Sequence, residues 1–144
     1  MLRSCRYCGR VHDDKQKCLQ REDAERKRWM NRKHTDALQF RRTNMWTNKS
    51  IDIRNRDRYI CLCCKAQLPG TVNQLNTKNL SVHHIVPIEE DYNMRLSDSN
   101  LITVCDVHHE MCEAEQISRD TQRYLVEQSM RENGDTNDDV CVVL

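Results

Sequence analysis

Residues Ser81 to Cys112 read S-V-H-H-I-V-P-I-E-E-D-Y-N-M-R-L-S-D-S-N-L-I-T-V-C-D-V-H-H-E-M-C, and this stretch decides the fold. Two apolar runs, Val82–Ile88 and Leu101–Val104, flank a polar loop, which predicts a hairpin-like pair of strands. From Val107 to Leu125 apolar residues recur every three or four positions, which predicts a helix. The stretch therefore predicts two strands followed by a helix, an α+β arrangement.

The same stretch concentrates side chains that can bind metal ions or move protons. A ribbon followed by a helix can bring His84, Asn100 and His109 around one small volume. Successive side chains of a strand point to opposite faces, so the neighbours His83 and His84 cannot share a face in a regular strand. We therefore expect a strand end or a bulge at this pair.

The composition leaves little material for an apolar core. The chain has 144 residues, of which 38% are hydrophobic and 5% aromatic. A chain of this length favours one domain, and one so poor in large apolar side chains needs other cross-links. Nine Cys and six His supply them. The C-x-x-C pairs Cys5/Cys8 and Cys61/Cys64 favour metal sites over disulfides, and a reducing compartment.

Charge is distributed unevenly along the chain. Residues 1–58 carry 17 Lys and Arg against 8 Asp and Glu, a net +9, and residues 59–144 carry 6 against 14, a net −8. A basic half suggests that this part faces a polyanion such as DNA, the alternative being a solvated Arg-rich helix surface. The sequence starts without an apolar signal segment and contains no run of membrane-spanning length. We expect a cytoplasmic protein with no membrane partner.

The first metal-ligand pattern lies near the N-terminus. Cys5, Cys8, His12 and Cys18 form C-x2-C-x3-H-x5-C, and Gly9 follows the C-x-x-C turn. Zn²⁺ prefers four tetrahedral N or S ligands, and the ion would supply the folding energy of so small a loop. We expect a zinc knuckle in residues 1–20, the alternative being a disordered terminus that contains cysteines.

A basic helical arm is expected at residues 21–50. The highly charged segment Leu19–Lys33 contains no Gly or Pro and is typical of an exposed helix. Residues His34–Arg42 are expected to form a loop or a joint. Thr43 is a candidate N-cap for a second helix, in which Trp46 and Ile53 lie on one face.

Residues Ile51–Ala114 resemble the HNH endonuclease family, whose fold is the ββα-metal motif. The resemblance rests on R-D-x-Y-x-C-x-x-C (Arg56–Cys64), H-H-I-V-P, N-L-I-T-V-C and the C-x-x-H-H end. The three letters of the family name fall on His84, Asn100 and His109. The resemblance implies a small zinc-stapled HNH domain at residues 51–132, preceded by the knuckle and arm and followed by a disordered acidic tail at residues 133–144.

The resemblance also implies a second structural zinc site. In it, Cys61 and Cys64 pair with Cys105 and His108, which leaves Cys63 as a spare thiol. The commoner family form has Cys where His108 stands, but imidazole is also a good zinc ligand. Cys112, one helical turn later, is the alternative fourth ligand.

The roles of the remaining residues follow from the same resemblance. His84 is expected to be the general base, since neutral imidazole accepts a proton near pH 7. His109 and His83 are expected to bind a catalytic Mg²⁺, Mn²⁺ or Ni²⁺, nitrogen ligands favouring the latter two. Asn100 either fixes the loop and orients the base, or touches the metal. Three arginines are expected to contact DNA phosphates, the alternative being a solvated helix end: Arg54, Arg56 and Arg58.

The resemblance therefore predicts a metal-dependent endonuclease that hydrolyses phosphodiester bonds of DNA. Related phage-type proteins act with the terminase in genome packaging, so the terminase is an expected partner and the host cytoplasm the expected location. The alternative is a non-catalytic, zinc-stabilised DNA-binding module that keeps the fold without cutting.

Overall fold

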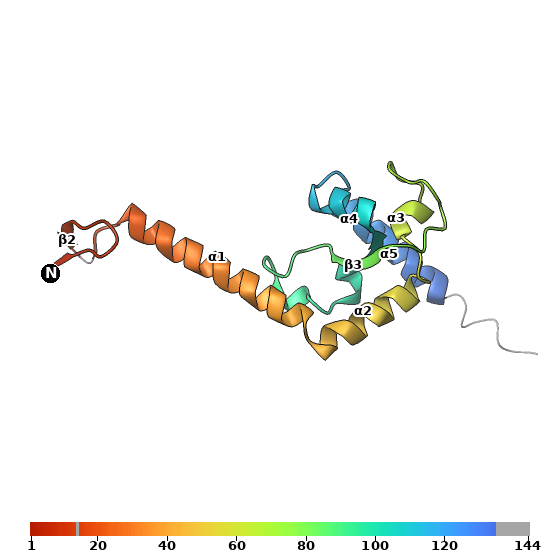
Figure 1. Ribbon diagram of the computed structural model, residues 1–144, viewed down its shortest axis with the longest axis horizontal. Helices are drawn as coiled ribbons and strands as arrows, with labels where there is room; N and C mark the ends of the chain where they lie inside the picture. The colour runs from red at the N-terminus through yellow and green to blue at the C-terminus, as the bar shows by residue number, and fades with distance from the viewer. Residues whose placement is uncertain (14, 135–144) are drawn as a thin grey trace, which may run out of the picture. The chain divides into compact units, whose positions relative to one another are not determined.

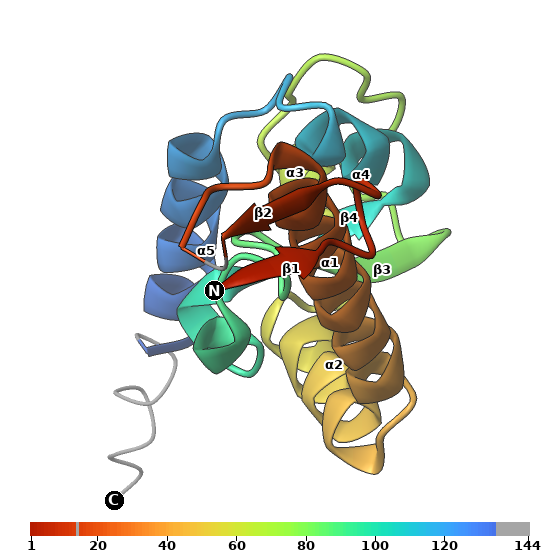
Figure 2. The same cartoon turned by 90° about the vertical axis from the view of Figure 1, so that its left-hand side faces the viewer.

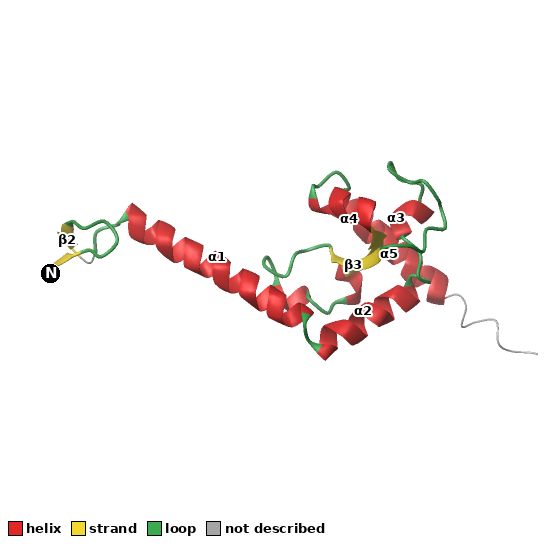
Figure 3. Cartoon of the chain, in the orientation of Figure 1, coloured by secondary structure: helices red, strands yellow, loops and turns green. Residues whose placement is uncertain are grey.

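The computed structural model describes residues 1–13 and 15–134, an α+β protein with two two-stranded antiparallel sheets (Figure 3). The chain divides into an N-terminal unit, residues 1–40, and a C-terminal unit that begins at Arg41. This division precedes residue 51, where we expected the second domain to begin, because the intervening helix contacts the strands of the C-terminal unit. From residue 135 onward, the expected tail lies outside the described residues.

The N-terminal unit begins with a small hairpin. Strands β1 (Leu2–Ser4) and β2 (Val11–Asp13) pair antiparallel and lie side by side in Figure 2. The turn between them holds Gly9 at a φ of +71°, a left-handed conformation that glycine adopts without a steric penalty. The Gly9 N–H donates to the Cys5 carbonyl at 2.8 Å, which closes the C-x-x-C turn.

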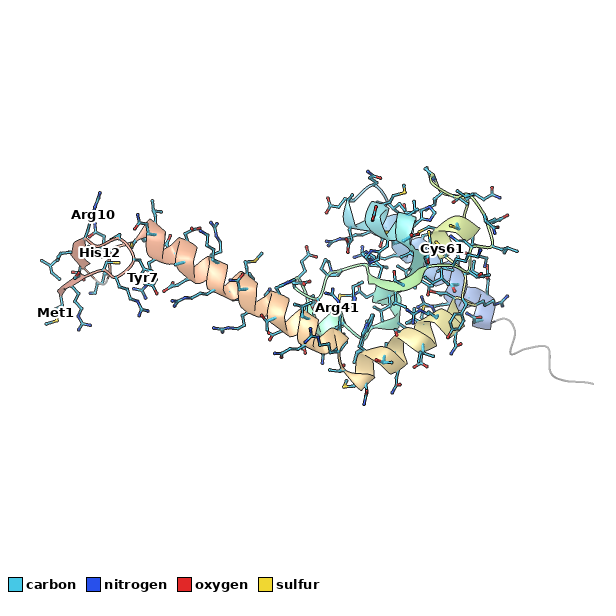
Figure 4. All side chains as sticks on the ribbon, viewed as in Figure 1. Met1, Tyr7, Arg10, His12, Arg41 and Cys61 are labelled. Carbon is cyan, nitrogen blue, oxygen red and sulfur yellow. The ribbon has the colours of Figure 1, made fainter. Side chains whose placement is uncertain are left out.

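The helix that follows is longer than predicted. Helix α1 (Leu19–Arg41) runs through the segment expected to be a loop or joint, so that prediction is wrong. Neither Gly nor Pro interrupts the segment, and the Thr35 hydroxyl donates to the Asn31 carbonyl at 2.9 Å, which satisfies it inside the helix. Ala37 and Phe40 near the end of this helix are buried, which periodicity alone did not predict. Arg41, labelled in Figure 4, is its last residue.

Two helices open the C-terminal unit. The side chain of Thr43 caps α2 (Asn44–Arg56) by accepting the Trp46 N–H at 3.2 Å, which confirms the predicted cap. Ile53 is buried on the inner face of α2 in a cluster with Val82 and Leu101, against which Trp46 packs. The short helix α3 (Leu62–Lys65) then presents the second C-x-x-C pair.

The central ribbon pairs β3 (Leu80–His84) with β4 (Leu101–Cys105), which confirms the predicted antiparallel pair. Figure 1 shows β3 between α2 and α4, and both helices contact it. Every residue of β4 is buried, and the strand contacts α2, α3, α4 and α5. The loop between the strands contains two short 3-10 helices, η1 (Tyr92–Met94) and η2 (Asp98–Asn100).

Strand β3 ends at His84 rather than at the predicted Ile88. Asn100 accounts for the early end. Its carbonyl accepts the Ile85 N–H at 2.9 Å, and its side-chain Oδ1 accepts the Val86 N–H at 2.7 Å. The amide side chain of Asn100 thus replaces the backbone hydrogen bonds of the sheet beyond Ile85. The strand end predicted at the histidine pair is confirmed.

The single helix predicted from Val107 to Leu125 is wrong, because two helices occupy this region. Helix α4 (Asp106–Glu113) ends in a Schellman motif: the Gln116 N–H donates to the Met111 carbonyl at 2.9 Å, and Glu115 has a φ of +58°. Helix α5 (Arg119–Gly134) follows, with Ser118 Oγ accepting the Thr121 N–H at 3.1 Å. Ile117 is buried between the two helices and continues the apolar spacing, so the sequence pattern did not reveal the break.

A buried carboxylate joins the elements of the C-terminal unit. Asp57 Oδ1 accepts from Arg56 Nε at 2.7 Å and from Ser129 Oγ at 2.8 Å. Its Oδ2 accepts the Thr103 N–H at 2.9 Å. The same guanidinium donates to the Leu101 carbonyl at 2.7 Å. Helix α2, strand β4 and helix α5 are therefore held by one ion pair and its hydrogen bonds.

Replacing this carboxylate is expected to be costly. Asp57→Ala leaves the Arg56 charge without its partner inside the fold, so we expect a loss of about 3–5 kcal/mol in the free energy of unfolding. Asp52→Ala, on the exposed face of α2, is the matched control and should change stability by less than about 0.5 kcal/mol. Urea denaturation in the presence of zinc measures both, and equal stabilities would contradict the role of Asp57.

Candidate metal centres and active site

The N-terminal unit brings together the four predicted ligands of the first metal site. The donor atoms of Cys5, Cys8, His12 and Cys18 all lie within 4.8 Å of one another. His12, labelled in Figure 4, places Nδ1 at 3.2 Å from the Asp13 carbonyl, to which the neutral ring can donate. Its Nε2 is buried and, within the described residues, makes no hydrogen bond. A metal ion would satisfy this nitrogen, so the residues fit zinc.

One thiol of this cluster ionises more readily than an ordinary cysteine. Hydrogen bonds from the backbone N–H groups of Cys8 and Tyr7 hold the pKa of Cys5 at about 6. Since the thiolate is the form that binds metal, the turn prepares a ligand before any ion arrives.

The C-terminal unit assembles the second predicted cluster from α3, β4 and α4. His108 Nδ1 lies 3.5, 3.4 and 3.3 Å from the sulfurs of Cys61, Cys64 and Cys105, and the last two sulfurs are 3.9 Å apart. With Zn–S bonds of about 2.3 Å and Zn–N bonds of about 2.1 Å, tetrahedral ligand atoms lie roughly 3.5–3.8 Å apart. The spacing of the four atoms is therefore that of a zinc tetrahedron.

A backbone carbonyl orients the imidazole of His108 in this cluster. His108 Nε2 lies 3.0 Å from the Pro69 carbonyl, so it can donate there and keep the Nδ1 lone pair for the metal. The turn predicted at Pro69–Gly70 is confirmed, and Gly70 has a φ of +90°. A Cβ on Gly70 would lie 3.2 Å from Met111 Sδ, so both this close approach to α4 and the left-handed backbone favour glycine.

The cluster cannot hold three thiolates without a cation. A hydrogen bond from the Cys63 thiol, helped by the N–H groups of Cys64 and Cys105, lowers the pKa of Cys61 to about 4. Burial, and then the charge of Cys61, raise the pKa of Cys64 to about 12. Metal binding must therefore release protons from the remaining thiols, as it does in other thiolate sites.

Cys112, the alternative fourth ligand, lies outside this cluster. Its thiol is hydrogen-bonded to that of Cys63, and both are buried. The hydrogen bonds to Cys112 and Cys61, and then burial, raise the pKa of Cys63, so it stays protonated. The geometry places His108, and not Cys112, with the three sulfurs.

A third cluster combines the predicted ligands His83 and His109 with Glu113, whose donor atoms lie within 4.8 Å of one another. The two imidazole rings meet edge to face with centroids 5.0 Å apart. His109 Nε2 is 3.7 Å from Glu113 Oε1. Burial, and then the proximity of His109, lower the pKa of His83 to about 4, so this ring is neutral near pH 7.

Glu113 is the residue that the sequence reasoning missed. The signal that would have found it is helical spacing, because side chains four positions apart lie on the same face of a helix. Glu113 follows His109 by one turn of α4, and its side chain is 62% exposed. It lies at the rim of the cluster, where a carboxylate remains hydrated.

His84 lies on the other face of β3, as strand alternation requires. Its ring stacks on Trp46 with centroids 4.6 Å apart, and its Nε2 lies 3.0 Å from the Arg95 carbonyl. A proton on Nε2 leaves the lone pair of the neutral ring on Nδ1. Burial lowers the pKa of His84, partly offset by the hydrogen bond to Arg95. Because β3 ends here, His83 and His84 both line one cleft of about 840 Å³.

Asn100 is buried, and its side chain forms hydrogen bonds only with backbone groups among the described residues. Its Nδ2 donates to the carbonyls of Val86 and Met94 at 3.1 and 3.2 Å, and its Oδ1 accepts the Val86 N–H. Of the two roles left open, the geometry supports fixing the loop, since these bonds tie the two ends of the loop that carries the Arg95 carbonyl.

The three arginines expected to contact DNA separate into two kinds. Arg58 is exposed and Arg54 is half-buried. The expectation for Arg56 is corrected, because its side chain is 12% exposed and its guanidinium is bonded inside the fold to Asp57 and Leu101. Arg54 and Arg58 remain available for phosphate contacts.

The chain has no match among protein-family models, curated proteins or solved structures. Among the described residues, none of the helices combines the length and the apolar content that crossing a membrane requires. The three clusters of potential metal ligands are therefore the features of the described residues that bear on function.

Two zinc ions per chain are expected from the first two clusters. His108→Ala should lose one zinc and unfold the C-terminal unit, because the ion supplies much of the folding energy of such a site. Cys112→Ser is the matched control and should keep both ions. Cys8→Ser should lose one zinc while the C-terminal unit stays folded. Elemental analysis with circular dichroism tests this, and loss of zinc from Cys112→Ser would contradict the ligand assignment.

Proposed function

We propose that this protein is a metal-dependent DNA endonuclease of the HNH type. The observation that supports the proposal is the convergence of His83, from a strand, with His109 and Glu113, from the helix after the ribbon. Two antiparallel strands followed by a helix are also what the ββα-metal resemblance implies. The two thiolate clusters then serve as structural zinc sites.

The third cluster suits a catalytic divalent cation. Two imidazoles and one carboxylate form a mixed N and O ligand set, which accepts Mn²⁺ or Ni²⁺ as well as Mg²⁺. The cluster opens into the cleft, so coordination positions remain for water and a phosphate oxygen. When bound there, the ion would polarise the phosphodiester and stabilise the leaving oxygen.

In this proposal His84 is the general base. Its ring is neutral near pH 7 because burial lowers its pKa, and its Nδ1 carries the lone pair that accepts a proton from the attacking water. Stacking on Trp46 and the hydrogen bond to the Arg95 carbonyl fix the ring. Asn100 is a positioning residue, since it holds the loop that supplies this carbonyl.

DNA is the proposed substrate because residues 1–58 carry a net charge of +9, which favours binding of a polyanion. Arg54 and Arg58 would contact phosphates outside the cleft and position the duplex without reading its sequence. A phage or prophage setting, with the terminase as partner and the host cytoplasm as location, rests on the family resemblance.

His84→Ala is expected to abolish nicking of a supercoiled plasmid. Removing a positioned general base should slow cleavage at least roughly 100-fold. Zinc content and DNA binding should stay unchanged, because this ring belongs to neither zinc cluster. The assay titrates Mg²⁺, Mn²⁺ and Ni²⁺ against the wild type and the variant, with His34→Ala, an exposed helix residue, as the matched control.

The rival function is a zinc-stabilised DNA-binding module without catalysis. Both functions predict DNA binding through the basic half, but only the enzyme predicts metal-dependent cleavage that disappears with His84. A wild-type protein that binds DNA and leaves the plasmid intact with every one of these metals would favour the binding module.

Glu113→Ala is expected to weaken Mn²⁺ binding by roughly 10- to 100-fold, because a charged oxygen ligand is lost. Electron paramagnetic resonance of free Mn²⁺ measures the affinity directly. Glu110→Ala, exposed on the same helix, should bind Mn²⁺ as the wild type does. Unchanged affinity in Glu113→Ala would remove this carboxylate from the ligand set.

A further inference from the structure

The cleft beside the third cluster carries charges of both signs. Its lining includes two arginines, Arg41 and Arg119, and three glutamates, Glu89, Glu113 and Glu115. Neither arginine belongs to the motifs that carried the family resemblance. Both are described residues of the C-terminal unit.

The two arginines approach the cluster from different elements. Arg41 ends α1 and is exposed, and Arg119 begins α5 with its side chain 38% exposed. Arg119 Nη1 donates to Glu90 Oε2 at 2.8 Å, which leaves its other guanidinium N–H groups able to donate elsewhere. Both arginines line the same cleft as His83 and His109.

The charge of the cleft depends on the ion. Two arginines face three glutamates in the lining, and Arg119 is also paired with Glu90, so carboxylates outnumber guanidinium groups and disfavour an anion. A divalent cation at the third cluster would add two positive charges and offset that excess. An anion should therefore enter this cleft only after the metal.

We propose that Arg41 and Arg119 form a phosphodiester-binding site that accepts its anion only when the neighbouring cluster holds a divalent cation. This inference rests on the proposed function and identifies the residues that hold the phosphate to be cut. Guanidinium forks bind phosphate oxygens through paired, charge-assisted hydrogen bonds. A diester carries one negative charge, and its ester groups can lie against the apolar wall of the cleft, which includes Val82, Ile85 and Ile117.

The test uses the full chain with Mn²⁺ and dimethyl phosphate. Protein-bound Mn²⁺ shortens the ³¹P relaxation time of a phosphate bound next to it, so a titration gives the affinity of the diester. Arg41→Gln and Arg119→Gln should each weaken binding about tenfold, the loss expected for one charge-assisted contact. The affinity for Mn²⁺, measured by paramagnetic resonance, should stay close to that of the wild type.

Matched controls come from the neighbours of the two arginines. Arg42→Gln changes the next residue, and Arg123→Gln changes the next turn of α5, where the side chain pairs with Asp120; neither lines the cleft. Both variants should bind dimethyl phosphate as the wild type does. Equal weakening in the controls would indicate a general charge effect and overturn the site.

The failures of the two proposals are distinguishable. If Mn²⁺ binds but Arg41→Gln and Arg119→Gln leave the diester affinity unchanged, the arginine site is overturned and the nuclease proposal stands. If the third cluster binds no Mn²⁺, both are overturned. A phosphorothioate DNA duplex should displace dimethyl phosphate at a lower phosphate concentration than inorganic phosphate; the reverse order would assign the cleft to free phosphate.

Discussion

The structure of the C-terminal unit depends on four ligand atoms that have the spacing of a zinc tetrahedron. Cys61 caps α3 and Cys64 lies within it, Cys105 ends β4, and His108 lies in the first turn of α4. The chain has few large apolar side chains, and the core around these ligands contains many cysteines. Hydrophobic burial alone would give this core little stability. An ion bound by all three elements would supply the missing cross-link, and the buried Asp57 network ties β4 to α2 and α5.

The same constraint positions the candidate active site. His109 directly follows a candidate zinc ligand in the sequence, so fixing His108 also fixes the helical turn that carries the imidazole of the candidate site. On the other side, the β3–β4 register pairs His83 with Ile102, within the strand that ends in Cys105. The separation of His83 and His109 is therefore set by short, rigid segments attached to the zinc cluster. A site built this way needs no large core to hold it.

Much of this arrangement could be predicted from the sequence, because residue spacing determines ligand geometry. The C-x-x-C turns, the paired strands, the Thr43 cap and the strand end at the histidine pair depend on local rules. The break between α4 and α5 was not predicted, because Ile117 preserves the apolar period while Glu115 adopts a left-handed backbone. The burial of Arg56 was not predicted either. Its guanidinium donates to the carbonyls of Asp98 and Leu101, which are distant in the sequence and come together only in the fold. Local pattern predicts elements and ligands, whereas long-range polar contacts require coordinates.

The chemistry of the ligands also separates the roles of the three clusters. Thiolates are soft ligands, so the two cysteine clusters favour zinc over the harder cations, and their complete tetrahedra leave no position for a substrate. The cluster of His83, His109 and Glu113 has no sulfur ligand, its carboxylate is largely exposed, and it opens into the cleft. Cations that prefer oxygen and nitrogen therefore compete best there. One small chain can thus keep structural and exchangeable ions apart by ligand type alone, without a large interior to isolate them.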